Sequence, residues 1–228
     1  SIGSCNRADY LSGDMKRHFT ALMVSAALLL QAFSAAAGDF VKINDLRSFS
    51  ENLAARTSAM TSIRADVVQK KYLSVFNAEV VSKGSFAWSA PDKLCLDYTT
   101  PAPYRIVIDG DRLLTVNAGK PSSANLKGNP VMSQMKNLLS ACMTGNVNAM
   151  GSDFEIEYFE SDREYKVVLV PVSDQLRGYV CRMEIFLDRK DMSVNTLVMH
   201  ENETDYTSYV FSGKKFNEAL PASVFAGR

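Results

Sequence analysis

The sequence has few of the residues on which most enzyme active sites depend. It holds two histidines, four cysteines and one tryptophan among 228 residues. His18 falls in the N-terminal segment, so His200 is the one histidine in the rest of the chain. A Ser-His-Asp triad or a metal site with several histidines is therefore almost excluded.

Active-site motifs and an excess of charge are also missing. The chain has no G-x-S-x-G nucleophile motif, no phosphate-binding P-loop and no G-x-G-x-x-G motif. Basic and acidic side chains number 25 each, so nothing in the net charge favours nucleic acid. We therefore expect no enzyme activity, no catalytic residue, no cofactor, no metal and no nucleic-acid partner.

Two acidic groupings could in principle contradict this expectation. The run His200-Glu201-Asn202-Glu203 could hold a metal in principle, but it fits a solvated strand end and turn better. Asp109 and Asp111 could form a carboxylate pair, but Asp109-Gly110-Asp111 is typical of a tight hairpin turn.

No apolar run near the N-terminus is long enough to cross a membrane. Phe19–Phe33 has about 15 residues, whereas a spanning helix needs roughly 20. The basic segment Met15–His18 precedes this run, and the small residues Ser34–Gly38 follow it. This order is typical of a secretory signal peptide, and we favour it over a membrane anchor.

The chain is accordingly divided into three parts. We expect an upstream segment without a fold at 1–14, a signal peptide at 15–37 cleaved near Ala37, and one domain at 38–228. At 46% hydrophobic residues the chain is too apolar to be disordered.

The domain carries an odd number of cysteines. Cys95, Cys142 and Cys181 permit at most one disulfide within the chain, and the pairing stays open. None of them has C-x-x-C spacing, so a zinc or thioredoxin-type site is a poor fit.

Alternation of apolar and polar residues predicts a mainly β domain. About ten or eleven strands in meander order are joined by short polar turns, which indicates an antiparallel sheet that must curl, close or split. Gly84 is expected to mark a bulge or bend. The alternating segments are Ile63–Tyr72, Val75–Ser89, Lys93–Thr99, Tyr104–Ile108, Leu113–Val116, Phe154–Phe159, Glu164–Val170, Tyr179–Leu187, Val194–His200 and Asp205–Phe216.

Two helices and one long loop interrupt the strands. Asn44–Thr61 has helical spacing and a capping residue at Asn44 or Asp45, whereas Gly119–Pro130 reads as a loop. Val131–Met143 is an apolar helix that is expected to cover the sheet. The residues expected to face the sheet from this covering helix are Met132, Met135, Leu138, Leu139 and Met143.

The strand alternation also selects candidates for an apolar groove. Any one of these side chains is more readily explained as ordinary core, but for the set a groove covered by the Met-rich helix is favoured. The candidates are Phe86, Trp88 and Ala90 on one strand and Leu94, Leu96 and Tyr98 on the next.

An ordered set of motifs resembles a known family. The stretches are Gln69–Lys71, Ser82–Trp88, Ala90–Leu96, Thr99–Pro101, Ile106–Asp111, Asp205–Phe211, Lys215–Asn217, Pro221 and Phe225. In this order they resemble the periplasmic lipoprotein carriers, the LolA-like proteins of double-membrane bacteria. Where family members often have an arginine before the proline of the second strand, this chain has Ala90, and Leu94 stands where an aromatic residue is often found.

The resemblance implies both a fold and a role. The fold would be an incomplete antiparallel β-barrel with a concave apolar face covered by helices. The role would be a monomeric periplasmic carrier that shields the acyl chains of lipoproteins, receives them from inner-membrane release machinery and passes them to an outer-membrane acceptor. Exposure of an acyl chain to water costs about 0.8 kcal/mol per CH₂, so such cargo needs a shield. The alternative is an envelope sensor or regulatory binding module on the same scaffold.

Overall fold

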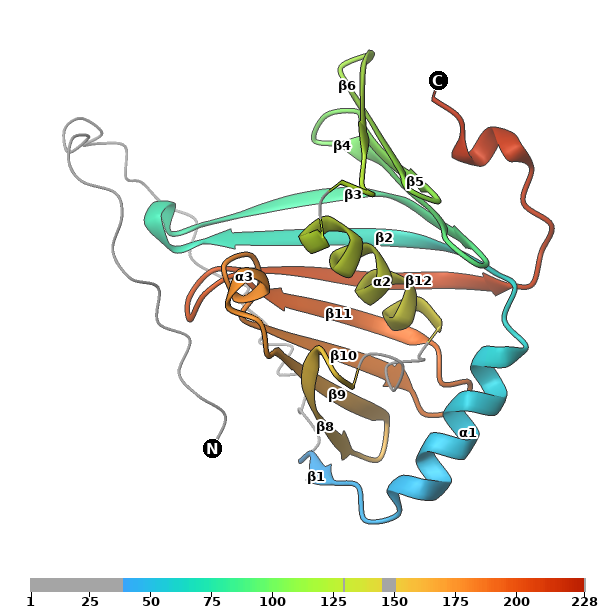
Figure 1. The fold of residues 1–228 in the computed structure, drawn as a ribbon, viewed down its shortest axis with the longest axis vertical. Coiled ribbons are helices and arrows are strands. Elements are labelled where there is room, and N and C mark those ends of the chain that lie inside the picture. Colours follow the sequence, from blue (N-terminus) through green and yellow to red (C-terminus); the bar gives the residue numbers. More distant parts are fainter. Residues whose placement is uncertain (1–38, 129, 145–150, 228) are drawn as a thin grey trace, which may run out of the picture.

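The fold is built on one antiparallel sheet of twelve strands (Figure 1). The structure, a computed structural model, describes residues 39–128, 130–144 and 151–227. The strands are β1 (Val41–Lys42), β2 (Ser62–Leu73), β3 (Ala78–Ser89), β4 (Lys93–Thr100), β5 (Tyr104–Asp109), β6 (Arg112–Asn117), β7 (Lys120–Asn125), β8 (Phe154–Glu160), β9 (Glu164–Pro171), β10 (Arg182–Asp188), β11 (Val194–His200) and β12 (Tyr206–Phe216). The helices are α1 (Leu46–Ser58), α2 (Pro130–Thr144) and α3 (Asp174–Arg177), with 3-10 turns η1 (Ser74–Phe76) and η3 (Ala222–Phe225).

Two meanders meet in the middle of the sheet. The strand order is β1-β8-β9-β10-β11-β12-β2-β3-β4-β5-β6-β7, so the pairing of β12 with β2 joins the C-terminal meander to the N-terminal one. β1 and β7 form the two edges of the sheet and do not pair with each other, so the barrel stays open. The prediction of a mainly β, incomplete barrel with few helices is confirmed.

The strand count and several strand boundaries differ from the sequence prediction. The segment expected as a loop contains β7, which pairs with β6 through Val116 and Pro121. All six residues of β7 are exposed, so no apolar alternation marks them, and an edge strand tolerates proline. Tyr179–Cys181 precede β10 instead of belonging to it, and Val75 lies in η1 instead of β3. The two-residue β1 was not predicted.

Gly84 is required where β3 bends. The pairing register with β4 shifts between Lys83 and Gly84, as expected for a bulge. A Cβ atom at this position would lie 2.1 Å from the carbonyl oxygen of Asp97, so no larger residue fits without movement of β4.

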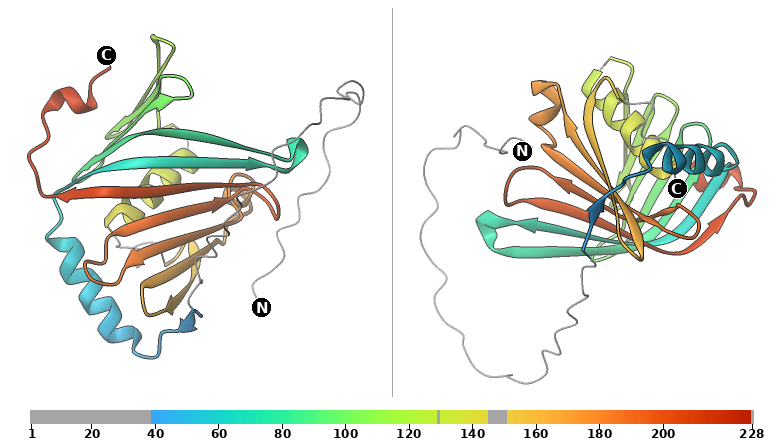
Figure 2. Two further views of the ribbon diagram at one scale, coloured as in Figure 1. Left: turned by 180° about the vertical axis from the view of Figure 1, so that it is seen from behind. Right: turned by 90° about the horizontal axis from the view of Figure 1, so that it is seen from below.

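The two faces of the sheet carry separate apolar clusters. The concave face packs against α1 and α2, which lie on the same side of the curled sheet (Figure 2). Asp45 caps α1 by accepting from the backbone N–H of Ser48 at 2.9 Å. The convex face has a smaller cluster in which Val107 and Cys95 contact the C-terminal segment through Phe225. The groove candidates therefore belong to the concave face, where the helices pack.

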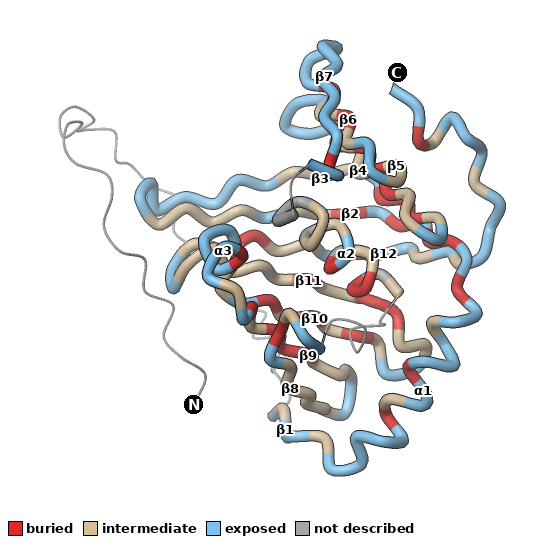
Figure 3. The backbone as a smooth tube through the Cα atoms, viewed as in Figure 1, coloured by how far each residue is buried: buried red, intermediate tan, exposed pale blue. Residues whose placement is uncertain are grey.

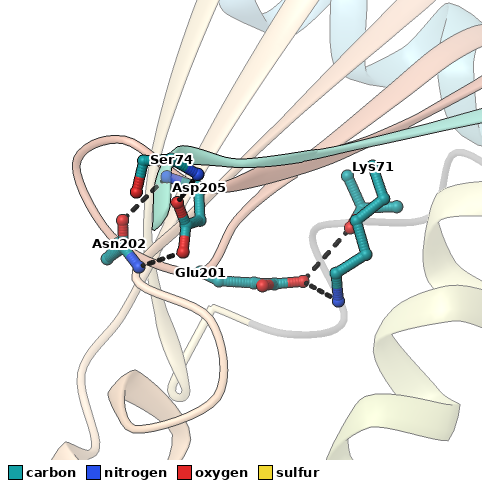
Figure 4. A network of polar contacts seen from close by, with 6 residues as sticks. Lys71, Ser74, Glu201, Asn202 and Asp205 are labelled. Atoms are coloured by element: carbon teal, nitrogen blue, oxygen red, sulfur yellow. Dashed lines mark hydrogen bonds and ion pairs between the residues drawn. The ribbon is translucent and has the colours of Figure 1, made fainter. Parts of the chain in front are cut away.

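A polar cluster fixes the outer end of the β2–β3 hairpin (Figure 4). The Asp205 carboxylate, in the turn before β12, accepts from the backbone N–H of Ser74 at 2.8 Å and from the side-chain amide of Asn202 at 3.1 Å. Thr204 donates to the Ser74 hydroxyl at 3.1 Å. These hydrogen bonds, led by those from Ser74, lower the pKa of Asp205 to about 2.

The depressed pKa predicts a pH dependence of this end of the hairpin. Because the carboxylate is favoured in the folded state, its contribution to stability is complete above its usual pKa near 3.8 and is lost as the pH falls through about 2. The amide chemical shift of Ser74, followed by NMR, is expected to titrate with a midpoint near pH 2. Asp205→Asn should remove that titration. A midpoint near pH 4 in the wild type would show that the hydrogen bonds to Asp205 do not stabilise its carboxylate.

Candidate functional site

Four of the six predicted groove residues are buried on the concave face. Phe86, Trp88, Leu94 and Tyr98 belong to the larger apolar cluster, and Phe86 also packs against Phe211 of β12 with ring centroids 5.1 Å apart. Leu96 is partly buried and packs against the same cluster. Ala90 is exposed in the turn between β3 and β4, so it lies outside this set.

Helix α2 lies on the concave side of the sheet and contacts β11. Leu138 and Cys142 are fully buried in the same cluster as the groove candidates, and Ala141 is buried with them. Burial raises the pKa of the Cys142 thiol, as expected for an apolar surrounding. The side chains of the remaining predicted covering residues lie outside the described ones: Met132, Met135, Leu139 and Met143.

Side chains pack closely over the middle strands of the concave face in this conformation. A void of only about 10 Å³ lies between β2, β3, β11 and β12, bordered by Ile63, Phe86, Phe211 and Phe216. Since a void of that size holds no more than about one water molecule, an acyl chain can enter between these strands only if a covering helix moves away. The groove residues and the helix therefore form a closed apolar interface.

Two polar groups lie within this interface. The indole N–H of Trp88 is buried with no acceptor among the described residues. Tyr98 donates its hydroxyl to the Gln69 side chain on β2, and burial raises its pKa. The sequence placed Gln69 in a family motif but not among the groove residues, because Gln69 lies on β2 and Tyr98 on β4, with β3 between them.

Lys136 attaches α2 to the turn between β5 and β6. Its ammonium group donates to the carbonyl oxygen of Gly110 at 3.2 Å and to the Asp111 carboxylate at 3.1 Å. The Lys136 side chain is 14% exposed, so the contact is partly shielded from water. The attachment holds the covering helix in a chain that has Ala90 where members of the family it resembles often have an arginine. From the sequence, Asp111 was interpreted as a turn residue.

Helix α1 has its own polar attachment. The Arg56 guanidinium donates to the carbonyl oxygen of Asp191, in the turn between β10 and β11, at 3.0 Å. Its apolar residues Phe49 and Leu53 are buried in the concave cluster, where the Phe49 ring lies 5.0 Å from the ring of Tyr165. Both helices thus combine an apolar face with a polar contact at a turn.

The convex face carries a polar cavity of about 360 Å³ beneath the C-terminal segment. Arg105, 5% exposed, donates to the Asp97 carboxylate and to the carbonyl oxygen of Val224. These bonds tie η3 to β4 and β5. Charged and polar residues line much of the cavity, and Phe86 is the one groove candidate among the lining residues.

The weaker candidates for chemistry are engaged in structural contacts. His200 lies 2.9 Å from the Glu184 carboxylate, and this hydrogen bond is the main cause that lowers the pKa of Glu184. Asp109 lies within 3.5 Å of Lys93 across the strand pair. No group of three or more His, Cys, Asp or Glu residues within the described ranges could hold a metal ion.

Two further observations concern the cysteines and the helices. Cys95 and Cys142 are buried thiols in different apolar clusters, which excludes a disulfide between them.

Within 39–128, 130–144 and 151–227, none of the helices is long and apolar enough to cross a membrane.

Solved structures with a similar chain path have little sequence in common with this protein. A LolA superfamily protein from Nitrosomonas europaea is 11% identical, with a TM-score of 0.41, covering 82% of this chain and 98% of its own. A putative outer membrane lipoprotein-sorting protein domain from Vibrio parahaemolyticus is 7% identical, with a TM-score of 0.41 and coverages of 78% and 94%. Lipoprotein LppX from Mycobacterium tuberculosis is 11% identical, with a TM-score of 0.41 and coverages of 75% and 94%.

The comparison with family models is more decisive. No curated protein sequence matches the chain. The model described as outer membrane lipoprotein carrier protein LolA matches residues 58–227, which is most of the chain and includes every strand from β2 to β12. The chain therefore belongs to the LolA family.

Proposed function

We propose that this protein is a periplasmic carrier, without enzyme activity, that shields the acyl chains of lipoproteins and delivers them towards the outer membrane. One observation carries the proposal: the apolar concave face of an open sheet is covered by a helix, and not by a second sheet. Leu138 and Cys142 of α2 occupy the space that acyl chains would fill. Family membership over residues 58–227 supports the same role.

The chemistry of such a carrier is an exchange of apolar contacts. In the closed form, α2 buries Leu138 and Cys142 in the same apolar cluster as Trp88 and Leu94. When an acyl chain enters, it replaces α2 on the sheet, so the apolar area exposed to water changes little and the exchange can run in both directions. No bond is made or broken. The partners that this role requires are acylated lipoproteins, an inner-membrane release machinery and an outer-membrane acceptor.

Trp88 offers a direct test, because it is the one tryptophan of the chain and lies in the closed interface. A diacylated lipopeptide with brominated chains is expected to quench its fluorescence in a saturable manner, since bromine quenches tryptophan on contact. The same lipopeptide without bromine is the control. Absence of quenching at saturating lipopeptide would show that α2 does not yield to acyl chains, and the carrier role would fail.

The role in cells has a separate test. Depletion of the protein from its host is expected to leave lipoproteins at the inner membrane, which fractionation of the two membranes would reveal. Normal sorting of lipoproteins after complete depletion would contradict delivery as the function, even if the purified protein binds acyl chains.

Weakening the attachment of α2 is expected to speed acyl entry. Lys136→Met keeps the apolar stem but removes both contacts to the turn at Gly110 and Asp111. Since a partly exposed ion pair contributes about 1 kcal/mol or less, we expect the rate of Trp88 quenching to rise roughly two- to fivefold.

Two further variants show whether the pair itself acts. Asp111→Asn should give a similar increase, and the double variant should add little to either single change. Lys127→Met, at an exposed lysine before α2, is the matched control and should leave the rate unchanged. Additive effects of Lys136→Met and Asp111→Asn would show that the ion pair between these two side chains does not control the opening of α2.

A further inference from the structure

Large apolar side chains are exposed together at the outer end of the β2–β3 hairpin. Val75 and Phe76, in η1, are 85% and 73% exposed, and Val80 and Val81 on β3 are exposed as well. Figure 3 shows that exposed residues dominate this end of the hairpin. Single exposed apolar residues are common on protein surfaces, but a group of them marks a contact site.

The hairpin carries these residues away from the body of the protein. β3 pairs with β4 only from Lys83 onwards, so Ala78–Ser82 extend beyond the strand that follows. Five residues of strand span about 16 Å at roughly 3.3 Å each. Figure 1 shows the hairpin reaching past its neighbours. The exposed side chains of the tip can therefore enter another phase while most of the sheet stays outside it and the turn at Thr204 and Asp205 lies beside the tip.

The tip is held in one conformation before any contact. Asp205 fixes the backbone of Ser74, and the N–H of Asn77 donates to the carbonyl oxygen of Ser74 at 3.1 Å. Asn77 adopts a left-handed conformation with φ of 45°, and its side chain accepts from the Tyr72 hydroxyl at 3.1 Å. Because the turn is already ordered, little conformational entropy is lost when Val75 and Phe76 become buried.

Behind the apolar tip, the side chains change character in two steps. Tyr72 and Tyr206 come first, with stacked rings 5.6 Å apart. Lys70 and Lys71 come next along β2. The same order is found across the boundary between the acyl region of a bilayer and water. Apolar groups lie deepest, amphipathic aromatic rings come next, and lysines with long apolar stems lie nearest the water.

The charges near the tip favour apolar insertion over electrostatic attraction. Lys70 lies 3.3 Å from Glu79, and Lys71 lies 3.1 Å from Glu201, so both lysines are neutralised locally. The tip is also too small for a stable protein interface, which buries about 1,200 Å² or more. Two inserted side chains would instead give a weak and reversible contact with lipid.

We propose that η1, through Val75 and Phe76, is a membrane-docking element that inserts reversibly into the interfacial region of a lipid bilayer. The element lies on the outer end of the hairpin, and its residues are absent from the concave cluster. The proposal therefore does not rest on the carrier function, although a protein that exchanges acyl chains with membranes would gain from it.

Vesicle flotation with the full-length protein tests the docking element. The wild type is expected to float with phosphatidylcholine vesicles and with phosphatidylethanolamine–phosphatidylglycerol vesicles, and 0.5 M salt should not release it. Val75→Ser with Phe76→Ser should lower the partition coefficient about tenfold or more, since full burial of each apolar side chain is worth about 1.5–3 kcal/mol. Val41→Ser with Leu46→Ser, at exposed apolar residues of β1 and α1, is the matched control and should bind as the wild type does.

A second measurement keeps the test independent of folding and of cargo. Phe76→Cys labelled with an environment-sensitive dye should become brighter with vesicles, and brominated lipids should quench it. The serine double variant should still show Trp88 quenching by the brominated lipopeptide in solution, so loss of docking is separable from loss of acyl binding. A wild type that does not float, a serine variant that floats equally, release by salt, or a tip that captures a protein but no vesicle would each overturn the proposal.

Discussion

Replacing Leu96 with glutamate is expected to abolish acyl binding while the protein stays folded. Leu96 is partly buried on the concave face, opposite Phe86 on β3 and Ile106 on β5. In the closed form a carboxylate there can still reach water. An acyl chain laid over it would leave the charge buried without a partner, which costs several kcal/mol.

The expected size follows from that cost. A penalty of about 3 kcal/mol corresponds to a loss of affinity of more than a hundredfold, as measured by Trp88 quenching with the brominated lipopeptide. The melting temperature should fall by only a few degrees. Leu96→Met is the matched control and should bind normally, because it conserves volume and apolarity.

A glutamate on the convex face is expected to have a different effect from Leu96→Glu. Val107, on the convex face, is buried to 1% exposure and packs against Phe225. Val107→Glu is expected to unfold the protein, because no conformational change of α2 would bring water to that side. If Leu96→Glu unfolds the protein in the same way, the concave face is ordinary core. If it binds acyl chains normally, they lie elsewhere.

The sheet could be predicted from the sequence because alternation records burial directly. In β3, Phe86 and Trp88 point to the concave cluster while Ala87 points to the convex one, so the pattern and the structure contain the same information. β7 shows no alternation of apolar and polar residues, because both of its faces are exposed. The pairing of β12 with β2 joins residues more than a hundred positions apart, and no local pattern encodes it.

The site was predictable in part for the same reason. Alternation placed five of the six groove candidates with the concave cluster, Ala90 being the exception, and the apolar helix was expected to cover them. Whether the space beneath the helix is open or filled could not be predicted, since groove and core have the same composition. The attachment of Lys136 to Asp111 is a contact between a helix and a distant turn, and each residue alone looks like ordinary surface. Val75 fitted a strand pattern, and its exposure follows only from the length of β3 beyond β4.

Loss of the Arg105 side chain is expected to lower the free energy of unfolding by several kcal/mol. Its guanidinium is held between the Asp97 carboxylate and the carbonyl oxygen of Val224, so Arg105→Ala breaks two contacts at once. Removal of one partner of a buried ion pair costs about 3–5 kcal/mol. The Asp97 side chain is 31% exposed and is partly hydrated after the change, so we expect about 3 kcal/mol, near the lower end of that range.

Thermal unfolding and urea titration measure this cost. A loss of about 3 kcal/mol lowers the melting temperature of a domain of this size by roughly 6–12 °C. Arg112→Met is the matched control, because its contact with Asp109 is exposed and long at 3.9 Å, and it should shift the melting temperature by less than about 2 °C. A loss after Arg105→Ala no greater than that of Arg112→Met would show that η3 is held by its apolar contacts alone.

Substitution with methionine separates the ion pair from the packing. The Nε–H of Arg105 is buried without an acceptor among the described residues, so Arg105→Met removes an unsatisfied donor together with the two bonds. It also keeps most of the buried apolar stem, and we expect it to lose about half as much stability as alanine. Because the site lies on the convex face, acyl binding by either variant below its melting temperature should equal that of the wild type. Reduced binding would mean that the C-terminal segment is coupled to the groove through the sheet.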